Sequence, residues 1–327
     1  MLSVNGGKIN KEVFLKRIQE GFMNEQELIK WLLEGDVAIQ YQVHRDLFGE
    51  ELTDLRQRIA TEGYGQTYLS HRNSDGHWGR GFYQPKWICS HYTLLDLRNL
   101  GLPRDNPQAR ETVEMIAKQE KGIDGGVNPA ETVSQSDVCI NGMFMNYACY
   151  FSIDPELLES AVDFILSQKM DDGGFNCRLN RSGAKHSSLH TTICVLEGIC
   201  SYKKYGYSYR LKELEEAEKS AAEFILMHQF YRSDRTGDII SKRFLNFPFP
   251  PRWHYDIVRA LDCFRERNAP FDKRMELALE ELKKKRKKDG RWTTQSKIPG
   301  ETHLIMEKPG TSRWNTLRVM RILNKYN

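Results

Sequence analysis

Hydrophobic and polar positions along this chain form two kinds of segment with helical spacing. Segments of the first kind carry apolar residues among many charges, as in 211–229, where Leu214, Ala217, Ala221 and Phe224 lie between Lys and Glu residues. Segments of the second kind are far less charged, and they are 91–100, 141–151, 190–200, 254–264 and 315–323. Because charged helices face solvent and apolar helices are covered, the pattern predicts an outer and an inner layer of helices.

A short Asp-Gly phrase separates these segments. It occurs at Asp75-Gly76, Asp124-Gly125, Asp172-Gly173 and Asp289-Gly290, with a degenerate copy near Thr236-Gly237-Asp238. The first three copies are about 50 residues apart, and a fixed period of that size is the signature of a repeat protein. Glycine accepts the left-handed backbone that ends a helix, so each copy predicts a turn between two helices.

The starts of the apolar segments align without gaps and define a polar column. Its members are Gln40, His91, Asn141, His190, His254 and Asn315. The alignment predicts six helical hairpins, the first within residues 8–48, and six hairpins can close into a ring without exposed ends. The expected fold is therefore all-α: a single (α/α)6 toroid domain over residues 1–327. The column should line a polar central cavity that binds a small-molecule substrate or ligand, together with its neighbours Tyr41, Tyr92, Thr191, Tyr255 and Asp256.

Composition is consistent with one large domain outside the membrane. The 327 residues are 39% hydrophobic and 28% charged, and no apolar run is long enough for a transmembrane segment. The net charge of +4 is small, and the basic run 283–288 fits the C-terminal end of an outer helix, so no nucleic-acid partner is expected. The N-terminus lacks a signal-peptide pattern, and the seven cysteines are mostly in predicted helices. Reduced thiols in a cytoplasmic protein are the simpler interpretation.

The sequence Phe164-Ile165-Leu166-Ser167-Gln168 followed by Asp172-Gly173-Gly174-Phe175 resembles the repeat of squalene and terpene cyclases and of protein prenyltransferase beta subunits. The resemblance covers nearly the whole chain and implies the α–α toroid fold, but it specifies the activity poorly because these repeats are structural. Terpene cyclases of this type protonate their substrate with an Asp-x-Asp-Asp motif. No such motif occurs here, and Asp171-Asp172 belongs to a repeat turn, so a typical cyclase is not expected.

The resemblance to prenyltransferases implies a zinc ion. Those enzymes hold catalytic zinc with Asp-x-Cys at one inner helix and His at the next, and the matching residues here are Asp137, Cys139 and His190. Three such ligands leave an open position on zinc, as in catalytic sites. The alternative is that Asp137 caps a helix, Cys139 is a core residue and His190 belongs to the polar column. The basic residues that grip diphosphate in the family are missing from 130–136, so protein prenylation is not expected.

Three basic–aromatic pairs precede predicted inner helices: Lys86-Trp87, Arg252-Trp253 and Arg313-Trp314. If they converge with helix N-termini at one mouth of the ring, they suit a carboxylate or phosphate beside an apolar body. The alternative is that the Trp residues fill hairpin junctions while the basic residues are solvated. The proline-rich segment 247–251 is expected to form a rim loop or lid.

These features leave three classes of function open. The first is a transferase- or lyase-like enzyme acting on a small or isoprenoid-derived anionic substrate in the polar cavity, with or without zinc. The second is a non-catalytic toroid that binds a ligand or partner. The third is a carbohydrate-active (α/α)6 enzyme, which would need paired carboxylates that the predicted inner helix starts do not obviously supply.

Overall fold

The computed structural model describes residues 23–130, 134–177, 182–294 and 298–326. Over these residues the protein is mostly helical, and its one sheet is the antiparallel pair β1 (Trp292–Thr293) and β2 (Thr311–Ser312). The predicted all-α class is confirmed. Residues 8–22 of the predicted first hairpin and 131–133 of the segment before Asp137 lie outside the described residues.

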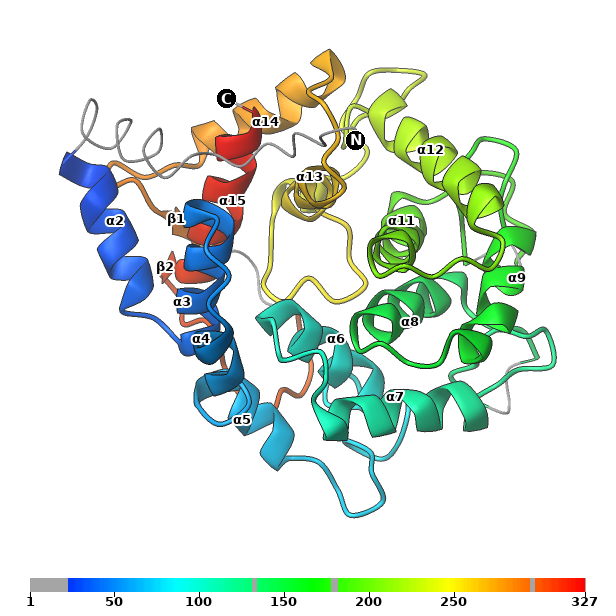
Figure 1. Ribbon diagram of the computed structural model, residues 1–327. Helices are drawn as coiled ribbons and strands as arrows, with labels where there is room; N and C mark the ends of the chain where they lie inside the picture. The colour runs from blue at the N-terminus through cyan, green and yellow to red at the C-terminus, as the bar shows by residue number, and fades with distance from the viewer. Residues whose placement is uncertain (1–22, 131–133, 178–181, 295–297, 327) are drawn as a thin grey trace, which may run out of the picture.

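Figure 1 shows two sets of helices around a common centre. The inner helices are α3 (Val37–Val43), α6 (Ser90–Leu100), α8 (Val138–Tyr150), α11 (Leu189–Lys204), α13 (Ile257–Glu266) and α15 (Arg313–Tyr326). The outer helices are α2 (Met23–Leu33), α4 (Thr53–Arg58), α5 (Gly63–Ser70), α7 (Pro107–Gln119), α9 (Glu159–Ser167), α12 (Leu211–Met227) and α14 (Glu276–Lys284). Short helical turns are η1 (His44–Phe48), η2 (Pro155–Leu158), η3 (Lys242–Leu245) and η4 (Lys273–Met275).

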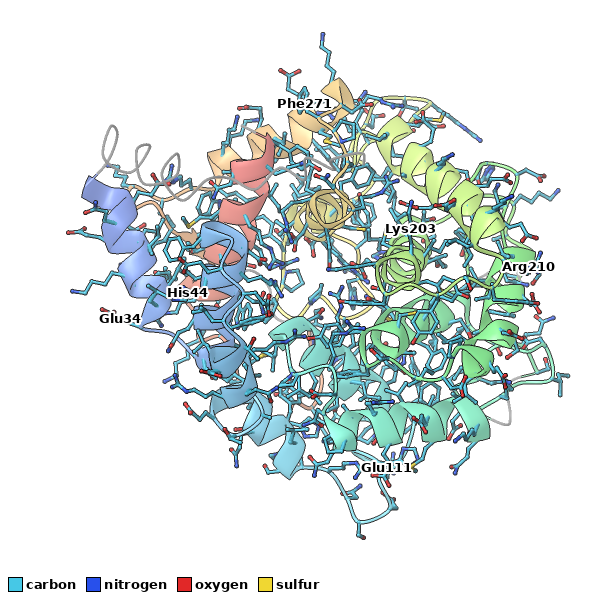
Figure 2. The ribbon with its side chains drawn as sticks, in the orientation of Figure 1. Glu34, His44, Glu111, Lys203, Arg210 and Phe271 are labelled. Carbon is cyan, nitrogen blue, oxygen red and sulfur yellow. The ribbon has the colours of Figure 1, made fainter. Side chains whose placement is uncertain are left out.

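The two layers have the polarity that the sequence predicts. Helix α8 is buried along almost its whole length, which explains why 141–151 is so poor in charge. Outer helices such as α12 bury one stripe, including Leu214 and Phe224, and expose the rest. Figure 2 shows the labelled Glu111 and Arg210 directed away from the centre. Burial of the inner layer on both sides therefore distinguishes the two kinds of segment.

The inner helices form a closed series, in which each one contacts the next and the last contacts the first. Helix α6 packs against α8, α8 against α11, α11 against α13, α13 against α15, and α15 against α3. The step from α3 to α6 is made by the Gln42 side-chain amide, which donates to the carbonyls of Asn99 at 2.8 Å and Leu100 at 3.2 Å. The first and last inner helices consequently lie side by side (Figure 1).

One hydrogen bond recurs after the Asp-Gly turns. The residue that follows each turn is buried, so its backbone N–H needs an acceptor inside the protein. An inner-helix side chain supplies it each time: Trp78 donates to Ser90 (2.9 Å), Val127 to Asn141 (2.7 Å), Phe175 to Thr192 (3.0 Å) and Trp292 to Thr316 (3.1 Å). The degenerate copy also forms a turn, because Arg232 and Ile239 are bridged as Lys121 and Val127 are.

This recurring bond shows that the ungapped alignment is wrong. Equivalent acceptors are Ser90, Asn141, Thr192 and Thr316, whereas the alignment placed His91, Asn141, His190 and Asn315 together. The donor and acceptor are 12, 14, 17 and 24 residues apart in successive copies, so the linker before the inner helix varies in length. When the linker is longer or shorter, the residue at a given position in the alignment points in a different direction around its helix. The six residues of the predicted column therefore do not all face one cavity.

Helices α8 and α11 approach each other closely at two glycines. A Cβ atom on Gly142 would lie 2.6 Å from the backbone of Cys194 and Val195, and one on Gly198 would lie 2.5 Å from the Gly142 carbonyl oxygen. Real Cβ contacts are essentially never that short, so both positions require glycine. The two helices are therefore packed backbone to backbone, which fixes the spacing of their side chains around the centre.

The described residues between β1 and β2, which are 294 and 298–310, lie at the end of the ring where α6 and α15 begin. They are anchored at three points: Trp87 donates from Nε1 to the Pro299 carbonyl (2.7 Å), and Tyr64 donates to the Met306 carbonyl (2.9 Å). His303 bonds the Thr93 hydroxyl at 2.9 Å. These anchors hold the segment over a cavity.

Candidate ligand site in the centre of the ring

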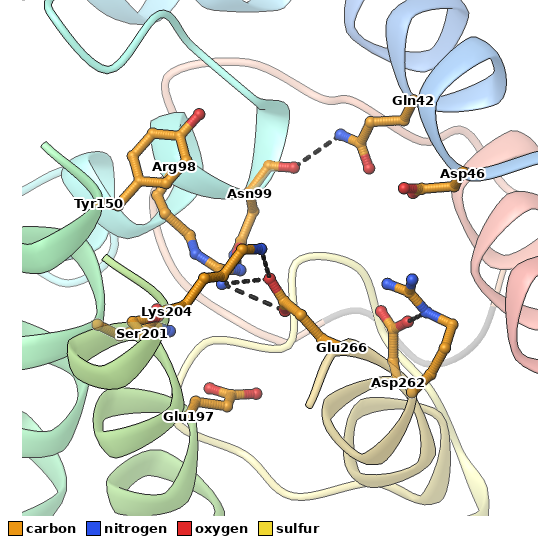
Figure 3. Close-up of polar contacts among 12 residues, drawn as sticks. Gln42, Asp46, Arg98, Asn99, Tyr150, Glu197, Ser201, Lys204, Asp262 and Glu266 are labelled. Atoms are coloured by element: carbon orange, nitrogen blue, oxygen red, sulfur yellow. Dashed lines mark hydrogen bonds and ion pairs between the residues drawn. The ribbon is translucent and has the colours of Figure 1, made fainter. Parts of the chain in front are cut away.

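A strongly charged cavity lies at the C-terminal ends of the inner helices, with a volume of about 100 Å³. We call it the arginine cavity. Its described lining has eight cations, which are Arg45, Arg98, Lys204, Arg252, Arg259, Arg265, Arg318 and Arg321, and three acids, which are Glu197, Asp262 and Glu266. Figure 3 shows several of these side chains, including Arg98, Lys204 and Glu266, converging from different helices. The excess of cations makes the cavity suited to an anion.

These residues come from polar stripes on otherwise buried helices. Helix α13 presents Arg259, Asp262 and Glu266 three and four residues apart, a spacing that places them on one face. Helix α15 presents Arg318 and Arg321 in the same way. The sequence predictions do not include these residues, because the predicted polar column is confined to the first residues of each inner helix and the charged stripes lie one to three turns further on.

Carboxylates neutralise most of the cations. Arg321 contacts the carboxylates of both Asp46, at 2.7 Å, and Asp262. Arg259 pairs with Glu197 at 2.7 Å. At the outer opening, Lys204 and Arg98 share Glu266 at 3.0 and 3.3 Å, and the Glu266 side chain is 33% exposed there (Figure 3). Asp46, which is not part of the lining, adds its negative charge to that of the three lining acids. Together these acids reduce the positive charge of the cavity without removing it.

Arg318 is the least compensated of these cations. Its side chain is 5% exposed, yet Nη2 is 4.0 Å from Asp256 Oδ1 and Nη1 is 3.5 Å from Asn315 Oδ1. Both distances exceed those of good charge-assisted bonds. Burial lowers the pKa of Arg318 and raises the pKa of Asp256 to about 6. Asp256 Oδ2 is also buried without a hydrogen-bond partner among the described residues. The attraction between Arg318 and Asp256 therefore does not compensate for the free energy that both charges lose when they are removed from water.

A second, larger cavity of about 470 Å³ lies under the segment that joins β1 to β2. We call it the apolar cavity. Apolar side chains from that segment and from the ring form much of its wall: Trp87, Phe249, Ile298, Leu304, Ile305 and Met306. Polar groups are fewer, and they include Glu307, whose Oε2 atom is buried without a hydrogen-bond partner among the described residues. Burial raises the pKa of Glu307.

The proline-rich segment 247–251 separates the two cavities. Phe249 and Arg252 line both of them, and the Phe249 ring stacks on Trp314 at 4.4 Å with an angle of 14°. Arg252 is 3% exposed and paired with buried Asp96. The segment thus lies between the two cavities, against the inner-helix residue Trp314, and forms part of the wall of each.

The three basic–aromatic pairs do not converge. Lys86 is exposed and lies over the rings of Tyr83 and Trp87. Arg313 donates to the Trp31 carbonyl at 3.0 Å and lies over the Trp31 ring, so it faces outer helix α2. Of the basic members, Arg252 lines both the arginine cavity and the apolar cavity, and the other two line neither of these. The aromatic members Trp87 and Trp314 do line cavities, whereas Trp253 stacks on His254.

Other residues expected in the cavity have local roles in the described structure. Gln40 donates to the Gly35 carbonyl, and Asn141 donates to the Val127 and Asp137 carbonyls. Tyr41 donates to Glu51, and Tyr255 donates to the Phe230 carbonyl.

The histidines and Tyr92 form aromatic clusters. His91 is fully buried with Tyr92 and bonds Tyr147, and burial lowers its pKa to about 3. His254 contacts His190 and Trp253, and burial lowers the pKa of both histidines to about 4. These imidazoles are therefore neutral near pH 7.

Asp137, Cys139 and His190 are divided between two surroundings. His190 Nδ1 accepts the backbone N–H of Tyr255 at 2.8 Å, while the backbone N–H of Cys139 donates to Cys177 Sγ at 3.0 Å. No group of three His, Cys, Asp or Glu side chains in the described parts of the chain could hold a metal ion. Asp137 has a partner of its own at the start of α8. Zinc binding stays a prediction, and we derive no chemistry from it.

No protein-family model matches the chain, and no curated protein sequence is detectably similar to it. Within the described ranges, none of the helices is both long and apolar enough to cross a bilayer. The two cavities are therefore the features of the protein that bear on its function.

Proposed function

We propose that the protein is an (α/α)6 toroid of six helical hairpins. The hairpins pair an outer with an inner helix: α2 with α3, α5 with α6, α7 with α8, α9 with α11, α12 with α13 and α14 with α15. The closed order of inner-helix contacts supports this proposal, because an open superhelix would leave α3 and α15 apart. The recurring bond from the turn to the inner helix supports the same repeat in at least four hairpins.

We propose that the toroid binds a small anionic molecule in the arginine cavity. Arg318 carries this proposal, because the polar partners of its buried guanidinium among the described residues are 3.5 and 4.0 Å away, and at those distances its N–H donors are available to a ligand. The Phe249 ring, 5.7 Å from the guanidinium, does not accept a hydrogen bond as a carboxylate would. An anion that accepts those bonds would replace the hydration lost on burial. The adjoining apolar cavity fits a ligand with an apolar body, such as an isoprenoid-derived anion.

The resemblance to toroid enzymes extends the proposal to an enzyme acting on that ligand in a reducing, cytoplasmic compartment, which the seven free cysteines support. A non-catalytic ligand-binding toroid is the alternative. A carbohydrate-active enzyme is less well supported, because such enzymes need two carboxyl groups free to act on the sugar. The acids lining the arginine cavity are each paired with a cation.

Calorimetric titration with inorganic diphosphate tests anion binding. We expect binding to the wild type and a loss of about tenfold or more in Arg318→Met, since a charge-assisted bond contributes about 1.5–3 kcal/mol. Arg235→Met is the matched control, because Arg235 is exposed on a turn outside the cavity. Equal affinities for both variants, with circular dichroism showing that each is folded, would contradict the proposal.

A further inference from the structure

Glu266 places its own carboxylate at the outer opening of the arginine cavity. It is the last residue of α13, and its oxygens lie between cations from two other inner helices, Arg98 on α6 and Lys204 on α11 (Figure 3). Lys204 Nζ donates to Oε1 at 3.0 Å, and Arg98 Nη2 contacts both oxygens at 3.3 Å. Burial raises the pKa of Glu266, but the attraction of the two cations outweighs burial and holds the pKa well below its usual range. A carboxylate of the protein itself therefore fills an anion position near pH 7.

Arg98 is only partly satisfied by this carboxylate. Strong pairs between Arg and a carboxylate use two guanidinium nitrogens, with bonds of about 2.7–2.9 Å. Glu266 contacts Nη2 alone, at the longer distance of 3.3 Å. Nη1 donates to Asn99 Oδ1 at 3.2 Å, while Nε is buried without a hydrogen-bond partner among the described residues. The edge of Arg98 formed by Nε and Nη2 thus suits an anion that binds it more closely than Glu266 does.

The backbone at the end of α13 does not favour Glu266 in this position. The C-terminal end of a helix carries partial negative charge, which repels a carboxylate and attracts a cation. Arg98 and Lys204, each in the last turn of its helix, have the favoured sign, whereas Glu266 has the opposite one. Its two ion pairs therefore hold Glu266 in place against the repulsion of its own helix end.

A second pocket lies on the other side of the Glu266 side chain. Glu266 lines this neighbouring pocket of about 250 Å³ as well as the arginine cavity, and the pocket wall includes Lys203, Arg267 and Asn268. Lys203 is 51% exposed, so the pocket is polar and open to water. Rotation of the Glu266 side chain away from Arg98 consequently moves the carboxylate into a solvated pocket that contains other cations.

We propose that Glu266 is an internal competitor for the arginine cavity: the anionic group of a ligand takes its place between Arg98 and Lys204, and the released carboxylate moves into the neighbouring pocket. This displacement rests on the proposed anion binding and determines which anions the site selects. A single carboxylate replaces Glu266 like for like and gains little. A phosphate or diphosphate group carries more charge and more acceptor oxygens for Nε, Nη2 and the Lys204 ammonium. Glu266 thereby makes the cavity selective for polyvalent anions.

Calorimetric titration of the full chain with inorganic diphosphate, at constant ionic strength and without other polyvalent anions, tests the displacement. Glu266→Gln keeps the size of the side chain but removes its charge, so diphosphate no longer competes with an ion-paired carboxylate. We expect this variant to bind diphosphate about fivefold or more tightly than the wild type. Arg98→Met in the Glu266→Gln background should remove the gain. Acetate, the monovalent probe, should bind the wild type much more weakly than diphosphate.

Two further variants separate displacement from a change in net charge. Glu197→Gln removes one negative charge from the same lining, while its partner Arg259 keeps two backbone carbonyl acceptors at 3.0 and 2.8 Å. Its gain in affinity should be smaller than that of Glu266→Gln. Glu266→Asp keeps the charge but shortens the side chain by one methylene, which weakens the hold on both cations. It should therefore also bind diphosphate more tightly than the wild type.

Equal diphosphate affinities for the wild type and Glu266→Gln would overturn the displacement while leaving anion binding in place. A gain in Glu197→Gln as large as that in Glu266→Gln, with none in Glu266→Asp, would overturn it too, because net charge would then explain the result. Equal wild-type affinities for diphosphate and acetate would contradict the selectivity. Absence of diphosphate binding in the wild type and every variant would instead overturn the proposed function of the cavity. Circular dichroism verifies each fold, and Glu266→Asp decides the matter if Glu266→Gln fails to fold.

Discussion

Arg318 and Asp256 face each other at 4.0 Å in the buried part of the ring, and neither offsets the other's desolvation. The Asp256 side chain is fully buried, and its Oδ1 atom is already used to cap α13 by accepting the Arg259 N–H at 2.8 Å. That bond holds the carboxylate at the helix end and away from the guanidinium. The geometry explains why burial dominates the pKa of both residues.

Asp256→Asn should therefore change stability in a pH-dependent way. The folded pKa of about 6 is above the ordinary value of 3.8, so the carboxyl group contributes stability below pH 3.8 that is lost as pH rises through 6. Asn keeps the cap and carries no charge. Relative to wild type, the variant should gain up to about 3 kcal/mol between pH 4 and pH 7. Urea unfolding at both pH values measures the difference.

The histidines titrate in the same window, but they are common to both proteins and cancel in the difference. A second comparison, Asp163→Asn, removes an exposed ion pair between α9 and Arg210 and should change stability by less than about 1 kcal/mol. A stability difference between Asp256→Asn and wild type that is the same at both pH values would show that Asp256 titrates normally in the folded protein.

Gly198→Ala should destabilise the fold, because its Cβ would lie 2.5 Å from the Gly142 carbonyl oxygen and would force α8 and α11 apart. Overpacking of this kind costs about 1–3 kcal/mol. Ala is otherwise the better helix former, by about 1 kcal/mol, so an uncrowded site would be stabilised. Denaturant unfolding gives the sign directly. A more stable variant would mean that the two backbones are further apart than described.

Thr192→Val tests the recurring turn bond. The substitution preserves shape but leaves the buried N–H of Phe175 without its acceptor, which should cost about 1–3 kcal/mol. Thr53→Val on exposed α4 is the control and should change stability by less than about 0.5 kcal/mol. If the two substitutions cost the same, the bond from the turn to the inner helix does not hold the repeats together.

The helical class and the turns could be predicted from sequence alone. The spacing of apolar residues and the placement of glycine both reflect local backbone geometry, which does not depend on the rest of the fold. The Asp-Gly turns are found where predicted, with Gly76 and Gly173 at φ of 86° and 91°. The polar column was not predictable in the same way. Its members depend on linker length, and two added residues rotate a helical position by about 200°. Asn141 and Thr192 thus play one structural role although the alignment separated them.

The arginine cavity escaped prediction for a different reason. Arg321 is distant in sequence from Arg259 and Asp262, and it becomes their neighbour only when α13 and α15 pack together. Their spacing within each helix was visible, but a charged stripe on a helix usually faces solvent. The charged stripes of α13 and α15 are internal because the other faces of these helices are buried as well. That burial depends on the packing of the whole ring.

Zinc at Asp137, Cys139 and His190 remains testable by metal content. The prediction requires about one zinc per chain in protein purified without chelator, because three ligands and one open position form a complete catalytic site. Cys139→Ala and His190→Ala should each abolish the binding, while Cys200→Ala, at a comparably exposed cysteine, should retain it. Bound zinc would also require the His190 ring to turn or to bind through Nε2, because Nδ1 accepts the Tyr255 N–H. Substoichiometric zinc, or zinc that neither alanine variant removes, would contradict the prediction and leave Asp137 as a helix cap, Cys139 as a core residue and His190 as the acceptor of the Tyr255 N–H.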